Sequence, residues 1–265
     1  MITDTTATAI PMPTREEARA QGEAEYSALL AMLRPLTDAD WARPTECPGW
    51  TVREMVAHLA GAAEEAVRPT VQARHLARAR TRDRRLVPAD SLSAQQIADR
   101  VGRTPAEMLA EIERLCAKAP KKRAAVPGPA RAMRLPASVG APGPGDTMAY
   151  LRDVTYNRDI WMHRIDIDHA TGCGRAASDA EAPIVAQVVR DLSRAWTASP
   201  FTLSLTGRVE GAWRIGDGAG EGGSVRVDAV ALSRLLSGRS DETKMAYDGP
   251  EPDLPDRLRS ARLLF

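Results

Sequence analysis

The 265-residue chain has only three cysteines, Cys47, Cys116 and Cys173, and they are unevenly spaced. An odd, scattered set of this kind does not make the disulfide framework of a small secreted domain, so we expect a reducing, cytoplasmic environment. No apolar run approaches the roughly 20 residues that a membrane-spanning helix needs. Residues 1–13 lack a basic start followed by an apolar segment, so we expect no secretory signal and no membrane partner.

Aromatic residues make up only 4% of the sequence. The formal net charge of +1 does not indicate a polyanionic partner. One stretch, residues 74–85, is strongly basic and contains six arginines. Because no aromatic side chains that stack on bases are interleaved with it, we interpret this stretch as a solvated helix end or surface loop and expect no nucleic-acid partner.

The N-terminal part of the chain is predicted to be helical. Residues 14–34 have a helix-starting pattern, with Thr14 as the N-cap, acidic residues in the first turn and Pro35 after the end. A further helix is predicted to begin at Thr51, because Glu54 stands three residues later, as in a capping box.

Proline and glycine mark the middle of the chain. A helix from about 93 to 119 is predicted to be broken or kinked at Pro105. Residues 120–145 contain ten prolines and glycines, so we expect no regular element there, only a lid or a disordered excursion. A helix over about 147–170 is predicted to end at Gly172, and another to cover about 179–198.

The pattern changes after Pro200. Alternating segments that begin at Phe201, Gly211 and Ser224 predict short strands separated by glycine-rich turns. A helix over 229–236, a strand over 243–247 and a last helix near Asp253 are predicted to follow. We therefore expect a mainly α protein with a flexible tail (1–12), a helical bundle (13–199) and a small α+β domain (200–265).

Residue types that bind metals occur on two of the predicted helices. Asp159 and His163 are four residues apart, so both project from one helical face. If the helix that carries His58 packs beside that face, two imidazoles and one carboxylate converge and bind a divalent ion with open positions. Taken alone, the pattern also fits a local ion pair on a helix and a packed histidine.

Two segments resemble a known family. Residues 45–52 read TECPGWTV and run on into the segment around His58, and residues 159–166 read DIWMHRID. Both are similar to the signature segments of the mycothiol-dependent maleylpyruvate isomerase family, which belongs to the DinB-like metalloproteins. Segments near Gly211 and Arg239 resemble the small sterol-carrier-like domain that often follows. The resemblance implies a DinB-like four-helix bundle followed by a small α+β domain.

The same resemblance implies the site and its cofactors. His58, Asp159 and His163 would bind a divalent metal, with Zn²⁺ expected, and mycothiol or a related low-molecular-weight thiol would be the cosubstrate. Asp159 stands where the isomerase pattern has glutamate, which leaves the identity and affinity of the metal open. The family also places a functional arginine in its second domain; we choose Arg239 as this catalytic residue, with Arg226 as its rival.

Residues beside this triplet allow two interpretations. Asp166 either orients a metal ligand from one turn away or pairs at the surface with Arg158 or Arg164. Cys47 precedes the predicted helix of His58 and is interpreted as a structural thiol. Five further aromatic and histidine residues are interpreted as packing or are assigned no role: Trp41, Trp50, Trp161, His75 and His169.

The chemistry of this donor set agrees with the function that the resemblance implies. Two neutral imidazoles and one carboxylate leave a divalent site with a net charge of +1, which favours a thiolate ligand. The resemblance therefore implies a metal-dependent enzyme of the S-transferase or isomerase type that uses a thiol cosubstrate on a small electrophilic substrate. The alternatives are a non-enzymatic carrier of a hydrophobic molecule and a metal-binding regulator without turnover. The oligomeric state cannot be predicted from the sequence.

Overall fold

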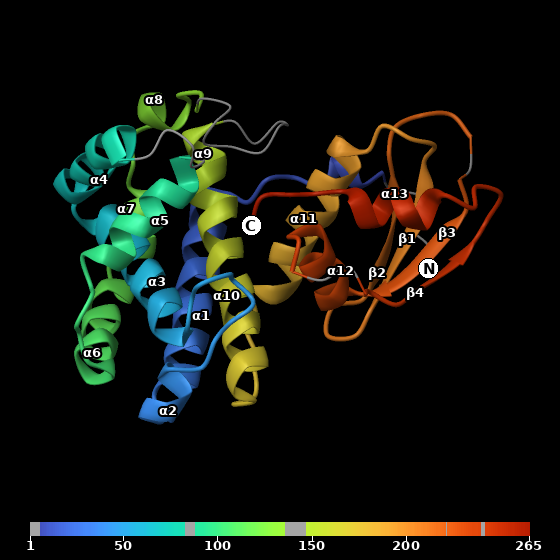
Figure 1. Cartoon of the computed structure of the whole chain (residues 1–265). Coiled ribbons are helices and arrows are strands. Elements are labelled where there is room, and N and C mark those ends of the chain that lie inside the picture. The colour runs from blue at the N-terminus through green and yellow to red at the C-terminus, as the bar shows by residue number, and fades with distance from the viewer. Residues whose placement is uncertain (1–5, 83–87, 136–146, 221, 240–241) are drawn as a thin grey trace. The chain divides into compact units, whose positions relative to one another are not determined.

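The computed structural model describes residues 6–82, 88–135, 147–220, 222–239 and 242–265 (Figure 1). These residues form two compact units. The helical unit contains the described residues between 13 and 180, and the sheet unit contains residues 6–12 and those from 181 onward. No helix in the described part of the chain has the length and apolarity to cross a membrane.

Four helices of the helical unit make its bundle: α1 (Arg15–Leu33), α3 (Val52–Val67), α6 (Pro105–Cys116) and α10 (Tyr156–Thr171). Helix α1 packs against α6 and α10, and α3 packs against the same two helices, which closes the ring. Each helix turns an apolar face inward. Side chains buried in this core include Leu29, Leu33, Met55, Leu59, Met108, Ile112, Ile160 and Ile167. The expected mainly α fold with a DinB-like bundle is confirmed.

Capping boxes begin three of these helices. Thr14 and Glu17 begin α1, Thr51 and Glu54 begin α3, and Thr104 and Glu107 begin α6. In α3 the carboxylate of Glu54 accepts a hydrogen bond of 2.8 Å from the backbone N–H of Thr51. An N-cap contributes about 1 kcal/mol, and here it also fixes the first turn of the helix that carries His58.

The helix predicted over 93–119 is interrupted near Pro105 as expected, but the break covers residues 99–104 and the first part begins earlier, at Pro88. The structure has two helices there, α5 (Pro88–Ala98) and α6, joined by a turn in which Gly102 has a φ of +83°. Pro105 begins α6 because a proline at the first helical position removes a backbone N–H that has no helical partner anyway.

The expectation of no regular element over 120–145 is also wrong for the described residues. Helix α7 (Ala119–Ala124) and the short α8 (Gly128–Arg131) lie there. Each has a proline in its first turn, where proline is compatible with a helix. Residues 136–146, the rest of the expected lid or excursion, lie outside the described residues.

Shorter helices complete the helical unit. They are α2 (Asp38–Trp41), α4 (Pro69–Arg82) and α9 (Met148–Tyr150). Helix α9 continues through a π-helical segment, η2 (Leu151–Thr155), into α10, which ends at Gly172 with a φ of +67° as predicted. Arg74 and Arg78 of the basic stretch are exposed on α4 and pair with Asp99.

The sheet unit is built on four strands in the order β2-β1-β3-β4. They are β1 (Phe201–Thr206), β2 (Gly211–Ile215), β3 (Ser224–Asp228) and β4 (Met245–Asp248). Strand β1 is antiparallel to β2 and parallel to β3, and β3 is antiparallel to β4. The alternation along β1 buries Phe201, Leu203 and Leu205 on one face.

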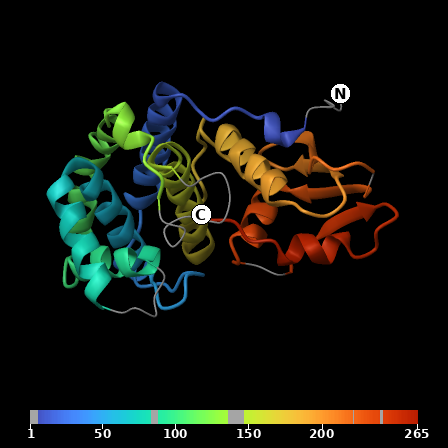
Figure 2. The ribbon, with the colours of Figure 1, turned by 90° about the horizontal axis from the view of Figure 1, so that it is seen from above.

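Three helices belong to this unit: α11 (Glu181–Ala195), α12 (Ala229–Leu236) and α13 (Leu254–Ser260). Helix α11 packs against β2 and against the 3-10 turn η1 (Ala7–Ala9), and α12 packs against β3 (Figure 2). The boundary between the units therefore lies at 180/181, whereas we expected it at 199/200. The apolar stripe of α11 predicts a helix, but it does not predict which element of the fold packs against that stripe.

The predicted flexible tail over 1–12 is wrong for the described residues 6–12. Ala7 is fully buried, and Gln187 of α11 donates a hydrogen bond of 2.8 Å to the carbonyl oxygen of Pro11. Thr8 donates a hydrogen bond of 3.0 Å to Asp217. This segment is therefore part of the sheet unit.

Gly61 lets α5 approach α3 closely. A Cβ at position 61 would lie 2.4 Å from the Cβ and 2.5 Å from the Cγ of Gln96, far inside the ~3.5–4 Å of a normal carbon contact. We expect Gly61→Ala to lower the free energy of unfolding by about 1–3 kcal/mol because of overpacking, although alanine favours a helix. Urea denaturation followed by circular dichroism measures this loss.

Gly128→Ala is the matched control. The nearest atom that a Cβ at position 128 would meet is Nη2 of Arg15 at 3.7 Å, an ordinary contact. We expect this variant to be as stable as the parent or slightly more stable, by up to about 1 kcal/mol. A similar loss of stability in both variants would contradict the packing argument.

Candidate metal centre

His58 on α3 and Asp159 and His163 on α10 face one another inside the helical unit. Their ligand atoms all lie within 4.8 Å of one another. Oδ1 of Asp159 is 3.4 Å from Nε2 of His58 and 3.3 Å from Nε2 of His163. The two imidazole rings are edge to face, with centroids 5.2 Å apart. The packing of α3 against α10 thus brings together three residues that are far apart in the sequence.

These separations suit a small divalent ion. Two ligand atoms that are each about 2.1 Å from a tetrahedral zinc ion lie roughly 3.4 Å from each other. Oδ1 of Asp159 has this spacing to Nε2 of both imidazoles, so the shorter side chain of aspartate still reaches both of them. The donor set is chemically suitable as well, because imidazole nitrogens and a carboxylate oxygen are ligands that zinc takes.

The cluster is largely buried but not sealed. The side chains of His58, Asp159 and His163 are 11%, 15% and 7% exposed. The ring of Trp50 lies beside both histidines, with centroid distances of 5.2 Å to His58 and 6.0 Å to His163. Trp50 therefore borders the cluster, beyond the packing role that we expected for it.

The charges inside the cluster shift its pKa values. Burial acts to raise the pKa of Asp159, but the charges of His58 and His163 hold it well below its usual range. Burial acts to lower the pKa of His163, but Asp159 raises it well above its usual range. Without a metal ion the cluster is thus an ion pair, and a metal ion that binds there replaces a proton.

Asp166 holds His163 from one turn away. Its Oδ2 is 2.9 Å from Nδ1 of His163, and its side chain is fully buried. The alternative of a pair at the surface is wrong, because Asp166, Arg158 and Arg164 are all buried, and Arg164 pairs with Glu25. This contact leaves Nε2 of His163 facing Asp159.

Cys47 lies beside this pair. Its Sγ is 3.9 Å from Oδ2 of Asp166, and Cys47, His163 and Asp166 form a second group that could hold a metal ion. Cys47 is partly buried. The interpretation of Cys47 as a structural thiol stays a prediction.

His58 is held by a hydrogen-bond chain that the sequence did not reveal. Nδ1 of His58 is 2.7 Å from Oε1 of Gln96, and Nε2 of Gln96 donates a hydrogen bond of 2.9 Å to Glu65. Glu65 also contacts Nδ1 of His75 at 2.7 Å, and Nε2 of His75 is 3.0 Å from Asp99. His75, to which we assigned no role, is fully buried in this chain.

One signal for this network was present in the sequence. Glu65 is seven residues after His58, which is two turns along the same helical face. Gln96 and His75 gave no comparable signal, because they lie on other helices. His169 is exposed and lies 3.7 Å from Glu46.

The two arginines proposed as catalytic lie in the sheet unit. Arg239 is partly buried and follows Gly238, whose φ is +79°. Arg226 is exposed on β3. The role of either arginine in substrate binding stays a prediction.

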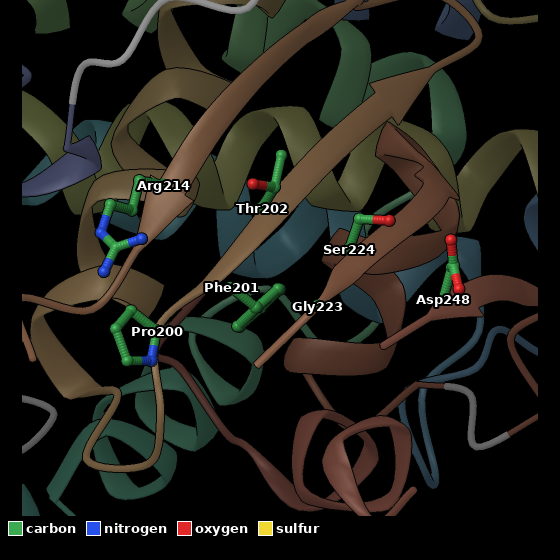
Figure 3. Close-up of a pocket in the computed structure, with 7 residues that line it drawn as sticks. All are labelled: Pro200, Phe201, Thr202, Arg214, Gly223, Ser224 and Asp248. Carbon is green, nitrogen blue, oxygen red and sulfur yellow. The ribbon is translucent and has the colours of Figure 1, made fainter. Parts of the chain in front are cut away.

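The sheet unit also has a pocket of about 260 Å³ at the ends of its strands (Figure 3). Polar side chains form much of its lining: Thr202, Arg214, Ser224 and Asp248. The remaining lining residues are Pro200, Phe201 and Gly223.

Comparison with known proteins supports the resemblance. A family described as "Mycothiol maleylpyruvate isomerase N-terminal domain" matches residues 23–168, more than half of the chain, and this segment contains His58, Asp159 and His163. A search of curated proteins gave no match.

Two similar solved structures are crystal structures of the mycothiol-dependent maleylpyruvate isomerase and of a histidine-to-alanine mutant of it. Both are 19% identical to this chain, with TM-scores of 0.58 and 0.57, and each match covers 94% of this chain and 98% of the other. At this identity the two structures show a shared fold. Together with the family match, they show that the chain belongs to the mycothiol maleylpyruvate isomerase family.

Proposed function

We propose that this chain is a metal-dependent enzyme that uses mycothiol, or a related low-molecular-weight thiol, to isomerise or S-conjugate a small electrophile. The donor cluster of His58, Asp159 and His163 carries this proposal. The family match adds the thiol, because the family is named for mycothiol. The resident ion that we propose is zinc, since two imidazoles and one carboxylate with open positions are typical of catalytic zinc sites.

The protein groups have separate parts in this chemistry. His58 and His163 present Nε2 toward the centre, and Asp159 supplies the single negative charge. A divalent ion held by these three residues would supply Lewis acidity and would favour the thiolate form of a bound thiol. Trp50 lies beside the two imidazoles and borders the site.

The substrate is proposed by likeness to the two solved structures, which are named as maleylpyruvate isomerases. We propose maleylpyruvate as the first electrophile to test, within a panel of other small electrophiles. Arg239 is the residue that we propose to bind a substrate carboxylate, because a guanidinium binds a carboxylate through two parallel hydrogen bonds. The three free cysteines support the proposal of a reducing, cytoplasmic location.

Turnover measurements test the proposal. We expect the zinc-loaded protein to consume maleylpyruvate or another electrophile of the panel only when mycothiol is added. We expect Arg239→Ala to lose about 2–5 kcal/mol of transition-state binding, which is at least a thirty-fold drop in kcat/KM, roughly, while Arg226→Ala retains activity. Absence of thiol-dependent turnover across the panel would contradict the enzyme proposal and favour the regulator.

A further inference from the structure

We propose that Glu65 is a positioning residue that acts through Gln96 to fix which ring nitrogen of His58 carries the hydrogen. This inference rests on the proposed role of His58 as a metal ligand. It concerns two residues that lie outside the ligand triplet, on α3 and α5.

The direction of each hydrogen bond in the chain follows from Glu65. An ionised carboxylate only accepts hydrogen bonds, so the end of the Gln96 amide that lies 2.9 Å from Oε1 of Glu65 is its NH₂ group. The carbonyl oxygen of Gln96 then faces Nδ1 of His58 at 2.7 Å. Because a carbonyl oxygen also only accepts, Nδ1 of His58 carries a hydrogen, which leaves Nε2 as the ring nitrogen that can bind a metal ion.

The opposite order is unfavourable between Gln96 and Glu65 and for metal binding by His58. With the amide of Gln96 reversed, its carbonyl oxygen would face the carboxylate of Glu65, and two acceptors would meet without a hydrogen. Its NH₂ group would face Nδ1 of His58, so the neutral ring would carry its hydrogen on Nε2. That hydrogen would point at the place where a metal ligand needs a lone pair.

The surroundings hold this chain in place. Gln96 and Glu65 are 4% and 3% exposed, and His75, whose Nδ1 lies 2.7 Å from the same Oε1 of Glu65, is fully buried. Water therefore has little access to replace any of these bonds. Gly61 leaves just enough room for the Cβ and Cγ of Gln96 against α3, which restricts where the amide can lie.

The two imidazoles of the cluster are thus oriented by different means. Nδ1 of His163 meets the carboxylate of Asp166 directly at 2.9 Å. Nδ1 of His58 instead contacts the amide of Gln96, which can present either its oxygen or its NH₂ group. The hydrogen bond to Glu65 decides which of the two faces His58. Glu65 therefore orients the ring of His58 through Gln96, as Asp166 orients the ring of His163 directly.

An exchange of the two side chains tests this inference. In Glu65→Gln the fixed acceptor is lost, so the amide of Gln96 is free to reverse, and in Gln96→Glu two carboxylates face each other. We expect each single variant to bind Zn²⁺ about ten- to a hundred-fold more weakly. The double variant Glu65→Gln/Gln96→Glu restores an amide N–H that donates to a carboxylate, which in turn accepts from Nδ1–H of His58. We expect its affinity to return to within about three-fold of the wild type.

Two readouts separate the possible outcomes. Competition with a chromophoric chelator gives the Zn²⁺ affinity, and ¹⁵N chemical shifts of the metal-free protein report whether Nδ1 of His58 carries a hydrogen. A wild-type protein that binds no Zn²⁺ overturns the proposed function, while the ¹⁵N shifts still test the inference. Single variants with unchanged Zn²⁺ affinity and unchanged hydrogen on Nδ1 overturn the inference alone.

Adjacent glutamines provide a control that does not introduce charge. Gln96→Leu removes the acceptor for His58, and we expect it to weaken Zn²⁺ binding at least ten-fold, roughly as other losses of an orienting partner do. Gln95→Leu removes a neighbouring buried amide whose NH₂ group makes no hydrogen bond among the described residues, and we expect unchanged affinity. If either exchange variant fails to fold, the two leucine variants test the inference in its place. Equal Zn²⁺ affinities of Gln96→Leu and Gln95→Leu overturn the inference.

Discussion

Replacing both His58 and His163 by alanine is expected to abolish metal binding by the purified protein. The two Nε2 atoms supply two of the three ligands, and the variant leaves Asp159 as a single carboxylate. Binding of zinc by protein sites releases about 10 kcal/mol or more, so the loss of two ligands should weaken binding by at least about 5 kcal/mol, or roughly 10⁴-fold. Metal analysis after purification without chelators should find about one divalent ion per wild-type chain and essentially none in the variant.

His169→Ala is the control for this experiment, because His169 lies on the same helix α10 but is exposed. We expect it to retain the full metal content. Added Zn²⁺ should also raise the melting temperature of the wild type and of the control but not of the double variant, since a ligand stabilises only a state that binds it. A wild-type protein free of metal, or a double variant that keeps its metal, would contradict the assignment of these ligands.

Local sequence patterns were sufficient for most helices of the bundle. Threonine followed three residues later by glutamate predicts the starts of α1 and α3, and the structure has capping boxes at both positions. The strands β1, β2 and β3 also begin where the alternation of apolar residues begins. Each of these patterns is complete within a few residues, so no tertiary contact is needed to read it.

The effect of proline on a helix depends on its position in the helix. Pro105 begins α6, and Pro120 and Pro129 lie in the first turns of α7 and α8. The missing N–H that breaks the interior of a helix has no consequence in the first turn. The sequence did contain a signal for the start of α6, because Thr104 precedes Pro105 and forms a capping box with Glu107.

The candidate site was only partly predictable from the residues. The spacing of Asp159 and His163 places them on one helical face, but the approach of α3 to α10 is a tertiary contact, and only the family resemblance indicated it. The chain from His58 through Gln96 and Glu65 joins residues 31 and 38 positions apart. Neither the helical nor the strand periodicity relates residues so far apart in the sequence. A buried polar network of this kind can therefore be recognised only in the folded structure.

Removing the carboxylate of Glu25 is expected to destabilise the helical unit strongly. Nη1 of Arg164 on α10 lies 2.5 Å from Oε2 of Glu25 on α1, and the two side chains are 1% and 0% exposed. Arg164 also donates a hydrogen bond to the carbonyl oxygen of Ala176. Breaking a buried ion pair leaves a charge in a low dielectric, so Glu25→Ala should lower the free energy of unfolding by about 3–5 kcal/mol, measured by urea denaturation of the metal-free protein.

An exposed pair gives the matched control. Glu23, on the same helix α1, pairs with Arg19 at 3.1 Å, and their side chains are 39% and 31% exposed. Solvent screens this pair, so Glu23→Ala should lose less than about 1 kcal/mol. If Glu25→Ala loses no more stability than Glu23→Ala, the expectation that the buried pair contributes more to the free energy of unfolding than the exposed pair is wrong.

A double replacement separates the packing of this pair from its charge. Glu25→Leu with Arg164→Met removes both charges and keeps apolar volume between α1 and α10, so its stability should return to within about 1–2 kcal/mol of the wild type or exceed it. Arg164 is the residue next to His163, but it faces Glu25 while His163 faces Asp159. We therefore expect the double variant to keep its metal, and loss of metal from a fully stable double variant would show that the ion pair also positions His163.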